Sequence, residues 1–269
     1  MTNLPVQTEA VKLLTDKMGA VLAAYPDSNP QVRERFAQIC IALANSYELK
    51  KCDPRSIVTA IYGCAALGLV PDKTLGHVYI IPRKNKAGQV LATLMPGYRG
   101  YIELARRSGA IGYVDARVVY VNDEFDVRWG TDPGVVHHPW FVRGKDEPGE
   151  PWAAYCVAQL PGQSQYQFDV LTRTEIEAAR NSSEGSNKEW SPWVQHPAEM
   201  WRKTAVRRAS KYWPLSPMLA QAVAWDEQAD RGQRQQITMP EFTGEPVQAK
   251  SDPLMEGIGD EPEGGDHGE

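Results

Sequence analysis

The spacing of apolar residues changes once along this chain, near residue 70, and this change limits the folds that the chain can adopt. Before it, apolar residues recur every three or four positions, which predicts helices over 5–25, 30–47 and 54–67. Asp53-Pro54 supports the third helix because an aspartate cap followed by proline is a common helix start, and Gly68 provides a common end. We therefore expect the chain up to this point to be helical.

Beyond this point the pattern is that of short strands joined by polar turns. Residues 77–82 and 90–95 are rich in β-forming side chains and flank the polar turn 83–88, which predicts a hairpin with a basic tip. Asn122-Asp123 and Pro161-Gly162 are typical of tight turns between antiparallel strands. Further strands are expected over residues 111–121, 124–129, 152–160 and 165–171, and residues 130–150 are read as a Pro/Gly/charge-rich loop.

Helices interrupt this run of strands once and then follow it. They are expected over 97–108, from the capping residue Thr172 to about 180, over 197–214 and through 219–225. Because the strands do not alternate with long helices, a doubly wound nucleotide-binding fold is not expected. The order of elements predicts an α+β fold, in which an antiparallel sheet packs on helices and an N-terminal helical segment precedes it.

The charges are unevenly distributed and indicate three regions. The whole chain has a net charge of −5, but residues 226–269 carry 12 acidic and 3 basic residues, whereas residues 1–225 carry 26 basic and 22 acidic ones. The last segment is also rich in Gly, Pro and Glu, so we expect it to be a disordered acidic tail. We expect residues 1–50 to be a helical segment available for contacts in an oligomer, and residues 51–225 to be the functional core.

Several functional classes lack their sequence signatures. The chain has no apolar run of about 18 residues and no basic segment leading into an apolar stretch at its N-terminus, so neither a transmembrane helix nor a signal peptide is expected. Its four cysteines form no CxxC pair, which favours free thiols in a reducing cytoplasm over a zinc site. Neither GxxxxGKS/T nor a helix-opening GxGxxG is found, so a nucleotide-driven motor is not expected.

The helix predicted over 197–214 concentrates basic charge. Three of its cations recur every four residues and so lie on one stripe, beside a stripe that contains Trp201 and Tyr212. A basic face edged with aromatic rings suits a polyanion with stackable bases. A solvated face whose alkyl stems cover apolar neighbours has the same pattern, so this segment alone leaves both interpretations open. Its basic residues are Arg202, Lys203, Arg207, Arg208 and Lys211.

Two more basic elements precede this helix, namely the hairpin tip and the helix that opens with Gly-Tyr-Arg-Gly at residue 97. The arginines of that helix also have a local structural explanation. One can form an ion pair with Glu103, and those in the last turn can interact favourably with the negative end of the helix dipole. The functional interpretation is that guanidinium groups bind phosphates, with all three basic elements converging on one groove. The residues concerned are Arg83, Lys84 and Lys86 at the tip, and Arg99, Arg106 and Arg107 on the helix.

An enzyme is the second hypothesis. Asp123, Glu124 and Asp126 form the densest acidic cluster of the core, and a metal-dependent nuclease would need paired carboxylates to hold Mg²⁺. Solvated charges at a turn between two strands fit the same residues, and we prefer that interpretation. His137-His138 has no Cys or acid at ligand spacing, so we expect a polar loop there.

Four segments, in one order over roughly residues 50–220, carry a resemblance to a known family. The second contains Gly97-Tyr98-Arg99-Gly100, and the fourth contains Lys203-Thr204-Ala205-Val206-Arg207-Arg208. Together they resemble the RecT family of phage and prophage single-strand annealing proteins. The segments are 65–69 with 75–82; 97–100 with 104–109; 116–119 with 123–125; and 192–193 with 199–200, 203–208 and 211–212.

The resemblance implies an ATP-independent, non-catalytic recombinase. Such a protein coats single-stranded DNA, pairs it with a complementary strand and holds the nascent duplex in a homo-oligomeric ring or helical filament, usually beside a 5′→3′ exonuclease partner. It needs no cofactor, with Mg²⁺ at most a modulator of DNA binding, and it works away from membranes, in the cytoplasm of a bacterial host of a phage or prophage. The implied fold is α+β, with an antiparallel sheet packed on a long helix, distantly like the Rad52 annealing proteins.

The resemblance also implies where DNA binds. In the family the DNA lies in a narrow basic groove, where the hairpin tip reaches the bases and the late helix contacts the backbone. Tyr98 and Trp193 either stack on bases or pack in the core. The matching positions are Lys84, Arg99, Arg107, Arg202, Lys203, Arg207 and Lys211, and the basic pattern adds Lys86, Arg106 and Arg208 as DNA-binding residues.

The chemistry of annealing needs no ATP site. Base pairing and stacking supply the free energy, so the protein has only to reduce the repulsion between two phosphate backbones. Residues 1–225 have a net charge of only +4, so we expect repetition along a filament to supply avidity. A third hypothesis is a structural oligomer whose basic faces pair with the acidic tails of neighbours; in the DNA-binding hypothesis the tail repels misplaced DNA or recruits partners.

Overall fold

The computed structural model describes residues 8–85, 88–109, 111–183, 185–189, 191–214 and 216–240. The chain begins with helices, as predicted: α1 (Glu9–Ala24), α2 (Pro30–Ala44), the short 3-10 helix η1 (Tyr47–Leu49) and α3 (Pro54–Leu67). The Asp53 carboxylate caps α3 by accepting a hydrogen bond from the Ser56 N–H, and Gly68 ends the helix in the left-handed conformation at φ 64°. Both predicted helix signals are therefore confirmed.

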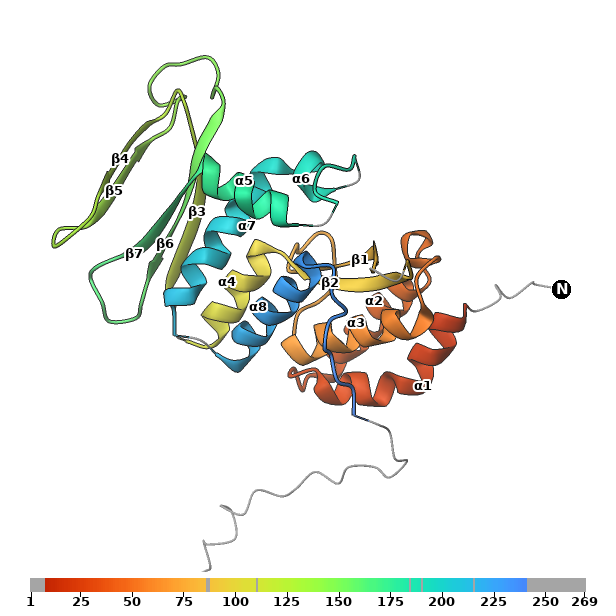
Figure 1. The fold of residues 1–269 in the computed structure, drawn as a ribbon. Coiled ribbons are helices and arrows are strands. Elements are labelled where there is room, and N and C mark those ends of the chain that lie inside the picture. The colour runs from red at the N-terminus through yellow and green to blue at the C-terminus, as the bar shows by residue number, and fades with distance from the viewer. Residues whose placement is uncertain are drawn as a thin grey trace, which may run out of the picture.

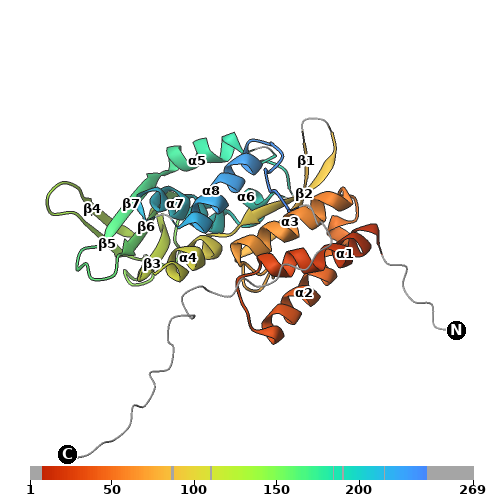
Figure 2. The same cartoon turned by 90° about the horizontal axis from the view of Figure 1, so that it is seen from below.

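The predicted hairpin is a two-stranded ribbon in which β1 (Val78–Lys84) pairs antiparallel with β2 (Val90–Pro96). Figure 2 shows this ribbon projecting beyond the helices beside it. The Gln235 side-chain amide accepts a hydrogen bond from the Leu94 N–H at 2.8 Å and donates one to the Leu94 carbonyl at 2.7 Å. These two bonds cover the outer edge of β2 at that point.

A three-stranded antiparallel sheet, with strand order β3-β6-β7, forms the other side of the molecule. Its strands are β3 (Tyr113–Tyr120), β6 (Pro151–Gln159) and β7 (Gln167–Thr172). Successive side chains of β6 point to opposite faces, so Cys156 belongs to the main hydrophobic core whereas Tyr155 belongs to a smaller cluster on the other face. Both faces of the sheet are thus covered.

Two helices, α5 (Arg173–Ser182) and α7 (Pro197–Ala209), cover one face of this sheet (Figure 1). A second hairpin, formed by β4 (Glu124–Arg128) and β5 (Gly134–His138), covers the other face. Strand β5 corrects the sequence analysis, which placed all of residues 130–150 in a loop. The sequence analysis missed β5 because the nearby Pro and Gly residues indicated a loop more strongly than the short strand-like alternation indicated a strand. In that alternation Val135 packs on the sheet and Val136 is exposed.

The last helices complete a central layer. Helices α4 (Tyr98–Arg107) and α8 (Pro217–Asp230) lie between the sheet layer and the N-terminal helices, and α6 (Pro192–Gln195) and the 3-10 helix η2 (Ser210–Tyr212) flank α7 (Figure 1). One hydrophobic cluster runs from Leu14 through Leu104 to Trp225, so the expected N-terminal segment shares its interior with the core. This architecture confirms the α+β prediction. No helix in the described ranges is long and apolar enough to span a membrane.

The folded part of the chain continues past the predicted start of the acidic tail. Helix α8 runs through Asp226 to Asp230, and Ile237 packs on the main hydrophobic cluster. The tail prediction therefore begins too early, because it counted the acidic residues of α8 as part of a solvated run. The remainder of that segment, residues 241–269, lies outside the described residues.

Candidate nucleic-acid interface

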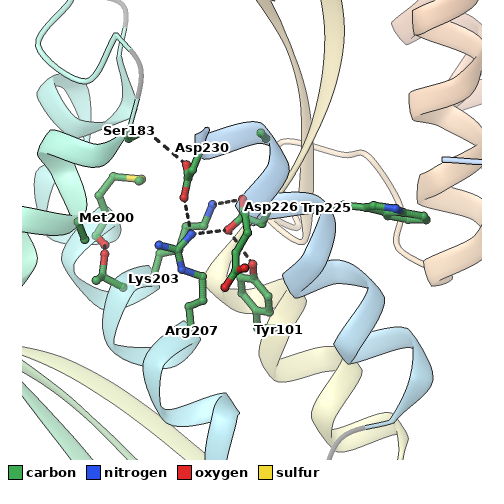
Figure 3. Close-up of polar contacts among 12 residues, drawn as sticks. Tyr101, Ser183, Met200, Lys203, Arg207, Trp225, Asp226 and Asp230 are labelled. Carbon is green, nitrogen blue, oxygen red and sulfur yellow. Dashed lines mark hydrogen bonds and ion pairs between the residues drawn. The ribbon is translucent and has the colours of Figure 1, made fainter. Parts of the chain in front are cut away.

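Two cations of the predicted basic helix point into the protein. Lys203 Nζ lies 2.8 Å from Asp226 Oδ1, and Arg207 Nη1 lies 3.2 Å from Asp226 Oδ2 (Figure 3). The Tyr101 hydroxyl donates a hydrogen bond to the same carboxylate at 2.7 Å. Lys203 is 6% exposed and Asp226 is 0% exposed, so this charge cluster joins α4, α7 and α8 in the interior.

Asp230 completes the buried charge cluster. It pairs with Arg207 and accepts a hydrogen bond from the Ser183 hydroxyl at 3.3 Å (Figure 3). Burial opposes the ionisation of Asp226, but the charges of Lys203 and Arg207 outweigh burial and hold the pKa of that carboxyl below its usual range. Two acids and two bases thus balance inside the fold. This corrects the expectation that the two cations lie on an exposed stripe.

The other predicted bases around α7 pair with acids at the surface. Arg202 pairs with Glu199 in the first part of α7. At the other end, Arg208 Nε lies 3.3 Å from Asp169 Oδ2 of β7, and Lys211 is exposed in η2. At a rise of about 1.5 Å per residue, roughly 14 Å separates Arg202 from Lys211. The predicted basic face is therefore not one continuous patch.

Two further cations that the sequence analysis assigned to the basic elements act as helix caps. Arg107 donates hydrogen bonds to the carbonyls of Leu67 and Gly68 at the end of α3. Arg83, from the hairpin, donates one to the Ala229 carbonyl at the end of α8, at 2.6 Å. Helix C-termini leave such carbonyls without partners, and cations bind them well. Both arginines thus help to join elements of the core.

Two other predicted residues lie apart from the ribbon, and a third is not described. Trp193 is 6% exposed within the main hydrophobic cluster, so it packs in the core rather than offering a face to a base. Arg106 is exposed in the last turn of α4, at the opposite end of that helix from Arg99. Lys86 lies outside the described residues.

Lys84 and Arg99 lie near the two ends of β1. Lys84 is exposed at the outer end of the ribbon, whereas Arg99 is exposed beside Tyr79 at the inner end. Neither cation forms an ion pair with a carboxylate in the part of the chain that the structure describes. At about 3.3 Å per residue, Tyr79 and Lys84 are about 17 Å apart. Two predicted DNA-binding residues thus lie along one strand.

The Gly-Tyr-Arg-Gly segment places Arg99 at this strand. Helix α4 begins directly against the preceding backbone, so that a Cβ atom on Gly100 would lie 2.0 Å from the His77 carbonyl oxygen. Only glycine allows this approach. The residues between the two glycines remain at the surface, and the Arg99 guanidinium lies 5.9 Å from the centre of the Tyr98 ring.

Tyr79 is a candidate that the sequence analysis missed. It is 36% exposed on β1, and the charge of Arg99 and the hydroxyl of Tyr98 are close enough to act on it. Partial burial raises the pKa of Tyr79, so its hydroxyl remains a hydrogen-bond donor. An exposed ring beside a cation suits stacking with an unpaired base. The sequence signal that could have identified Tyr79 is the alternation of side chains along β1, which buries Val78 and Ile80 and leaves the residue between them exposed.

A group of cations that the sequence analysis also missed surrounds the outer end of the ribbon. The Asp53 N–H donates a hydrogen bond to the Val90 carbonyl at 2.9 Å, so the preceding turn lies along the edge of β2. Because Val90 pairs with Lys84, only β2 separates that turn from Lys84, a distance of roughly 10 Å. Arg234 reaches the same region from the segment after α8. The exposed cations are Lys50, Lys51, Arg55 and Arg234.

The acidic cluster considered for a nuclease does not converge. Asp123 is 8% exposed, and its Oδ2 accepts a hydrogen bond from the Tyr120 N–H and lies 3.0 Å from His137 Nε2. Glu124 instead pairs with Arg143 at the surface. Within the described ranges, no group of three His, Cys, Asp or Glu side chains gathers as metal ligands would. Asp123 serves the turn, where it holds the end of β3 and the second hairpin together.

Exposed cations lie around the ribbon together with the exposed ring of Tyr79 and the half-buried ring of Tyr98, and we call this set of residues the ribbon strip. It can bind phosphates through its cations and stack bases on its rings. The two acids nearest Lys50 and Lys51 in sequence are already engaged, because Glu48 pairs with Lys73 and Asp53 caps α3. The strip consists of Lys50, Lys51, Arg55, Tyr79, Lys84, Tyr98, Arg99 and Arg234.

Comparison with known proteins gives this surface a context. The sequence model of the RecT family matches residues 34–240. The chain belongs to the RecT family. It is 43% identical over 182 residues to Protein RecT of Escherichia coli (strain K12), a match that covers 66% of this chain and 65% of that protein, which is just under two thirds of its length. It is also 36% identical over 94 residues to the uncharacterized protein YqaK of Bacillus subtilis (strain 168), covering 30% of this chain and 31% of that one.

The RecT family match confirms the resemblance seen in the four sequence segments. Its range of 34–240 contains every residue of the ribbon strip and of the buried charge cluster. It also ends where the described part of the chain ends. The family match thus covers the part of the fold that carries the candidate interface, whereas α1 precedes it.

Proposed function

We propose that this RecT-family protein anneals complementary single strands of DNA, without ATP, in homologous recombination. It coats single-stranded DNA, pairs it with its complement and holds the nascent duplex in a homo-oligomeric filament or ring. The observation that carries this proposal is the ribbon strip, where cations without carboxylate partners in the described chain lie around an exposed ring, Tyr79, and a half-buried one, Tyr98.

The chemistry of the strip suits a DNA backbone of any sequence. Lys and Arg side chains bind phosphates by releasing counterions, and these contacts read no bases. Tyr79 and Tyr98 supply rings on which any base can stack. A protein that pairs any strand with its complement needs contacts of this kind, because base edges must stay available to the second strand.

The internal ion pairs guide our choice of DNA-contacting residues. Lys203, Arg207 and Arg107 are engaged in the fold, so in our proposal they position α4, α7 and α8 against the ribbon. The exposure of Lys84 and Arg99 supports keeping both as proposed DNA contacts. The missed cations Lys50, Lys51, Arg55 and Arg234 join them.

Avidity supports an oligomer as the working form. Residues 1–240 carry 28 basic and 25 acidic residues, so each copy brings only a small positive charge to DNA. Copies arranged along one strand convert later contacts into intramolecular ones, which raises the overall affinity without new contacts.

We further propose a non-catalytic role in the cytoplasm of a bacterium that hosts a phage or prophage, beside a 5′→3′ exonuclease that supplies single strands. Mg²⁺ would act at most as a modulator of DNA binding, and no other cofactor takes part.

A strand-pairing assay tests this function. Two complementary oligonucleotides, labelled with a fluorophore and a quencher, are mixed without ATP at several protein concentrations. We expect faster quenching than in buffer alone, and no effect on a non-complementary pair. Pairing no faster than the protein-free control at any concentration would contradict the proposal. Incubating end-labelled DNA with the protein and Mg²⁺ or Mn²⁺ tests the nuclease alternative, for which cleavage is the positive result.

A further inference from the structure

We propose that Arg83 is a positioning residue for DNA binding. It attaches the outer part of the β1–β2 ribbon to α8, the helix that also holds α4, and thereby keeps Lys84 and Arg99 at a fixed spacing. The inference rests on the proposed function, in which these two cations contact DNA. It adds what determines the distance between the two contacts.

The two ends of the ribbon are held differently. At the inner end, β2 leads directly into α4, and the Gly97 N–H donates a hydrogen bond to the His77 carbonyl at 2.9 Å, so Arg99 stays close to the strands. The outer end, which carries Lys84, projects beyond the neighbouring helices (Figure 2). Because a two-stranded hairpin is only marginally stable alone, the position of this end depends on contacts with other elements.

Arg83 provides such a contact for β1. Its Nη1 donates a hydrogen bond to the Ala229 carbonyl of α8 at 2.6 Å, and within the described ranges no other side chain of β1 is hydrogen-bonded to a different element. Strand β2 has contacts of its own, in which the Ala92 N–H donates to the Ser56 hydroxyl at 2.8 Å and the Gln235 amide binds Leu94. Arg83 is thus the residue that holds the strand of Lys84 directly.

The same helix holds α4. The Tyr101 hydroxyl donates a hydrogen bond to the Asp226 carboxylate of α8 at 2.7 Å (Figure 3). Asp226 and Ala229 are three residues apart, a rise of about 4.5 Å along the helix, so both attachments lie within one turn. A third hydrogen bond, from the Gln235 amide to the Trp225 carbonyl at 3.0 Å, joins the middle of the ribbon to the same turn. The ribbon and α4 therefore share one rigid support.

Each attachment lies next to a proposed DNA contact. Arg83 precedes Lys84 on β1, and successive side chains of a strand point to opposite faces, so a guanidinium held against α8 directs the lysine away from that helix. On α4, Tyr101 is buried, whereas Arg99, two residues earlier, is exposed on the other side of the helix. Helix α8 thus sets where both cations reach the surface.

Arg83 itself is poorly placed to bind a phosphate. Its Nη1 already donates to the Ala229 carbonyl, and its Nε is buried. The cavity beside it, lined among others by Lys84, Thr93 and Gln233, has a volume of about 20 Å³, which is enough for one water molecule but not for a phosphate group. These observations favour positioning over direct binding as the role of this arginine.

Distances between two spin labels test the attachment without DNA. Lys84→Cys and Arg106→Cys place the labels on exposed positions of β1 and α4. The four native cysteines are all buried, and burial raises the pKa of each thiol, so they react far more slowly with the label than the two introduced ones. Pulsed electron paramagnetic resonance then gives the distribution of distances between the ribbon and α4.

We expect Arg83→Met to broaden this distribution, because it removes the attachment and keeps an apolar side chain. The variant should fold, since the Ala229 carbonyl still accepts a hydrogen bond from the Gly232 N–H at 3.0 Å. Arg180→Met is the matched control and should give wild-type distances. Arg180 is half-buried like Arg83, also has a buried Nε, and pairs with Glu177 of its own helix.

DNA binding is measured on the same variants with the native residues at positions 84 and 106. We expect Arg83→Met to bind single-stranded DNA roughly 3- to 10-fold more weakly, as for the lost preorganisation of one long side chain, with an unchanged salt slope because no phosphate contact is removed. In the wild type, Lys84→Ala and Arg99→Ala together should lose less binding free energy than the sum of the single losses, because rigidly spaced contacts assist each other. In the Arg83→Met background the two losses should add.

Tyr101→Phe releases the attachment of α4 and should also broaden the distribution, so it replaces Arg83→Met if that variant folds poorly by circular dichroism. Wild-type distances in both variants, equal broadening in Arg180→Met, or broadening with unchanged DNA affinity would overturn the inference. A lower salt slope with wild-type distances would make Arg83 a phosphate ligand instead. Failure of the proposed function gives a different result, in which even the wild type binds no DNA while the distances still change.

Discussion

Lys203 and Asp226 face each other between α7 and α8, with 2.8 Å from Nζ to Oδ1 and almost no solvent access to either side chain. The basic stripe and the family resemblance both suggested this lysine as a DNA contact. In the structure it is one of two cations that neutralise Asp226 and Asp230. Substitutions in this cluster should therefore report on stability, and substitutions in the ribbon strip should report on DNA binding.

Replacing Lys203 with methionine should lower the free energy of unfolding by about 3–5 kcal/mol, because it removes one partner of a buried ion pair and leaves Asp226 short of positive charge. Urea unfolding followed by circular dichroism measures this. The control Lys211→Ala, on an exposed residue beyond α7, should change stability by no more than about 0.5 kcal/mol. A Lys203→Met protein that is as stable as wild type but binds DNA weakly would place this lysine at the interface after all.

The buried charge cluster should also set how the protein responds to acid. The folded pKa of Asp226 is depressed, since Lys203 and Arg207 outweigh the effect of burial. Its contribution to stability is therefore complete above the unfolded pKa of about 3.9 and is lost as the pH falls through the folded value. We expect Asp226→Asn to be less stable than wild type near neutral pH, and the difference to shrink below about pH 4. Urea midpoints across this range give the result; a constant difference would argue against an ionised Asp226.

Single-residue changes in the ribbon strip should weaken DNA binding without unfolding the protein. For Lys84→Ala and Arg99→Ala we expect lower affinity for single-stranded DNA and a salt slope reduced by about 0.7 for each phosphate that the variant no longer binds. Fluorescence anisotropy at several salt concentrations measures both quantities. Arg128→Ala removes an exposed arginine that already pairs with Asp132 at 2.6 Å, and it should leave both unchanged. An unaltered slope in Lys84→Ala would remove that residue from the interface.

Tyr79 should contribute through its ring rather than through charge. Tyr79→Ala should cost about 1–3 kcal/mol of binding free energy to single-stranded DNA, the range for loss of one stacked base. Tyr79→Phe should retain most of the affinity, and neither variant should change the salt slope. The same anisotropy titrations distinguish stacking from phosphate binding, because a side chain that binds a phosphate would change the slope when it is removed.

The residues after α8 should have two separable roles: residues 231–240 stabilise the fold, and residues 241–269 oppose DNA binding through their charge. Residues 241–269 contain nine acidic and one basic residue, so deleting them changes the net charge from −5 to +3. We expect that deletion to tighten DNA binding at low salt and to leave thermal stability unchanged. Deletion from residue 231 onward also removes Gln235 and should lower the melting temperature. Equal melting temperatures for both truncations would show that residues 231–240 contribute nothing to the fold.

Signals that are local in sequence predicted much of the fold. The Asp53 cap, the Thr172 capping box and the hairpin of β1 with β2 depend on residues within a few positions of one another. Strand β5 was missed because its pairing with β4 gave a weaker pattern than the surrounding Pro and Gly residues.

The candidate site was less predictable because its residues meet over long sequence separations. Lys203 and Arg207 have the four-residue spacing of a solvated face, and only the partners on α8 show that this face is buried. Asp226 and Asp230 have the same four-residue spacing as Lys203 and Arg207. This equal spacing was the sequence signal that the two acids could pair with the two bases. The approach of Lys50 and Lys51 to the ribbon depends on a backbone hydrogen bond between distant segments, which no local pattern reveals.

The amide of Gln235 closes the open edge of the β1–β2 ribbon at Leu94. It occupies the place that a strand from another molecule would need, so a foreign strand cannot extend the ribbon into a larger sheet at that residue. The chain thus protects itself against edge-to-edge aggregation with a residue 141 positions away in sequence.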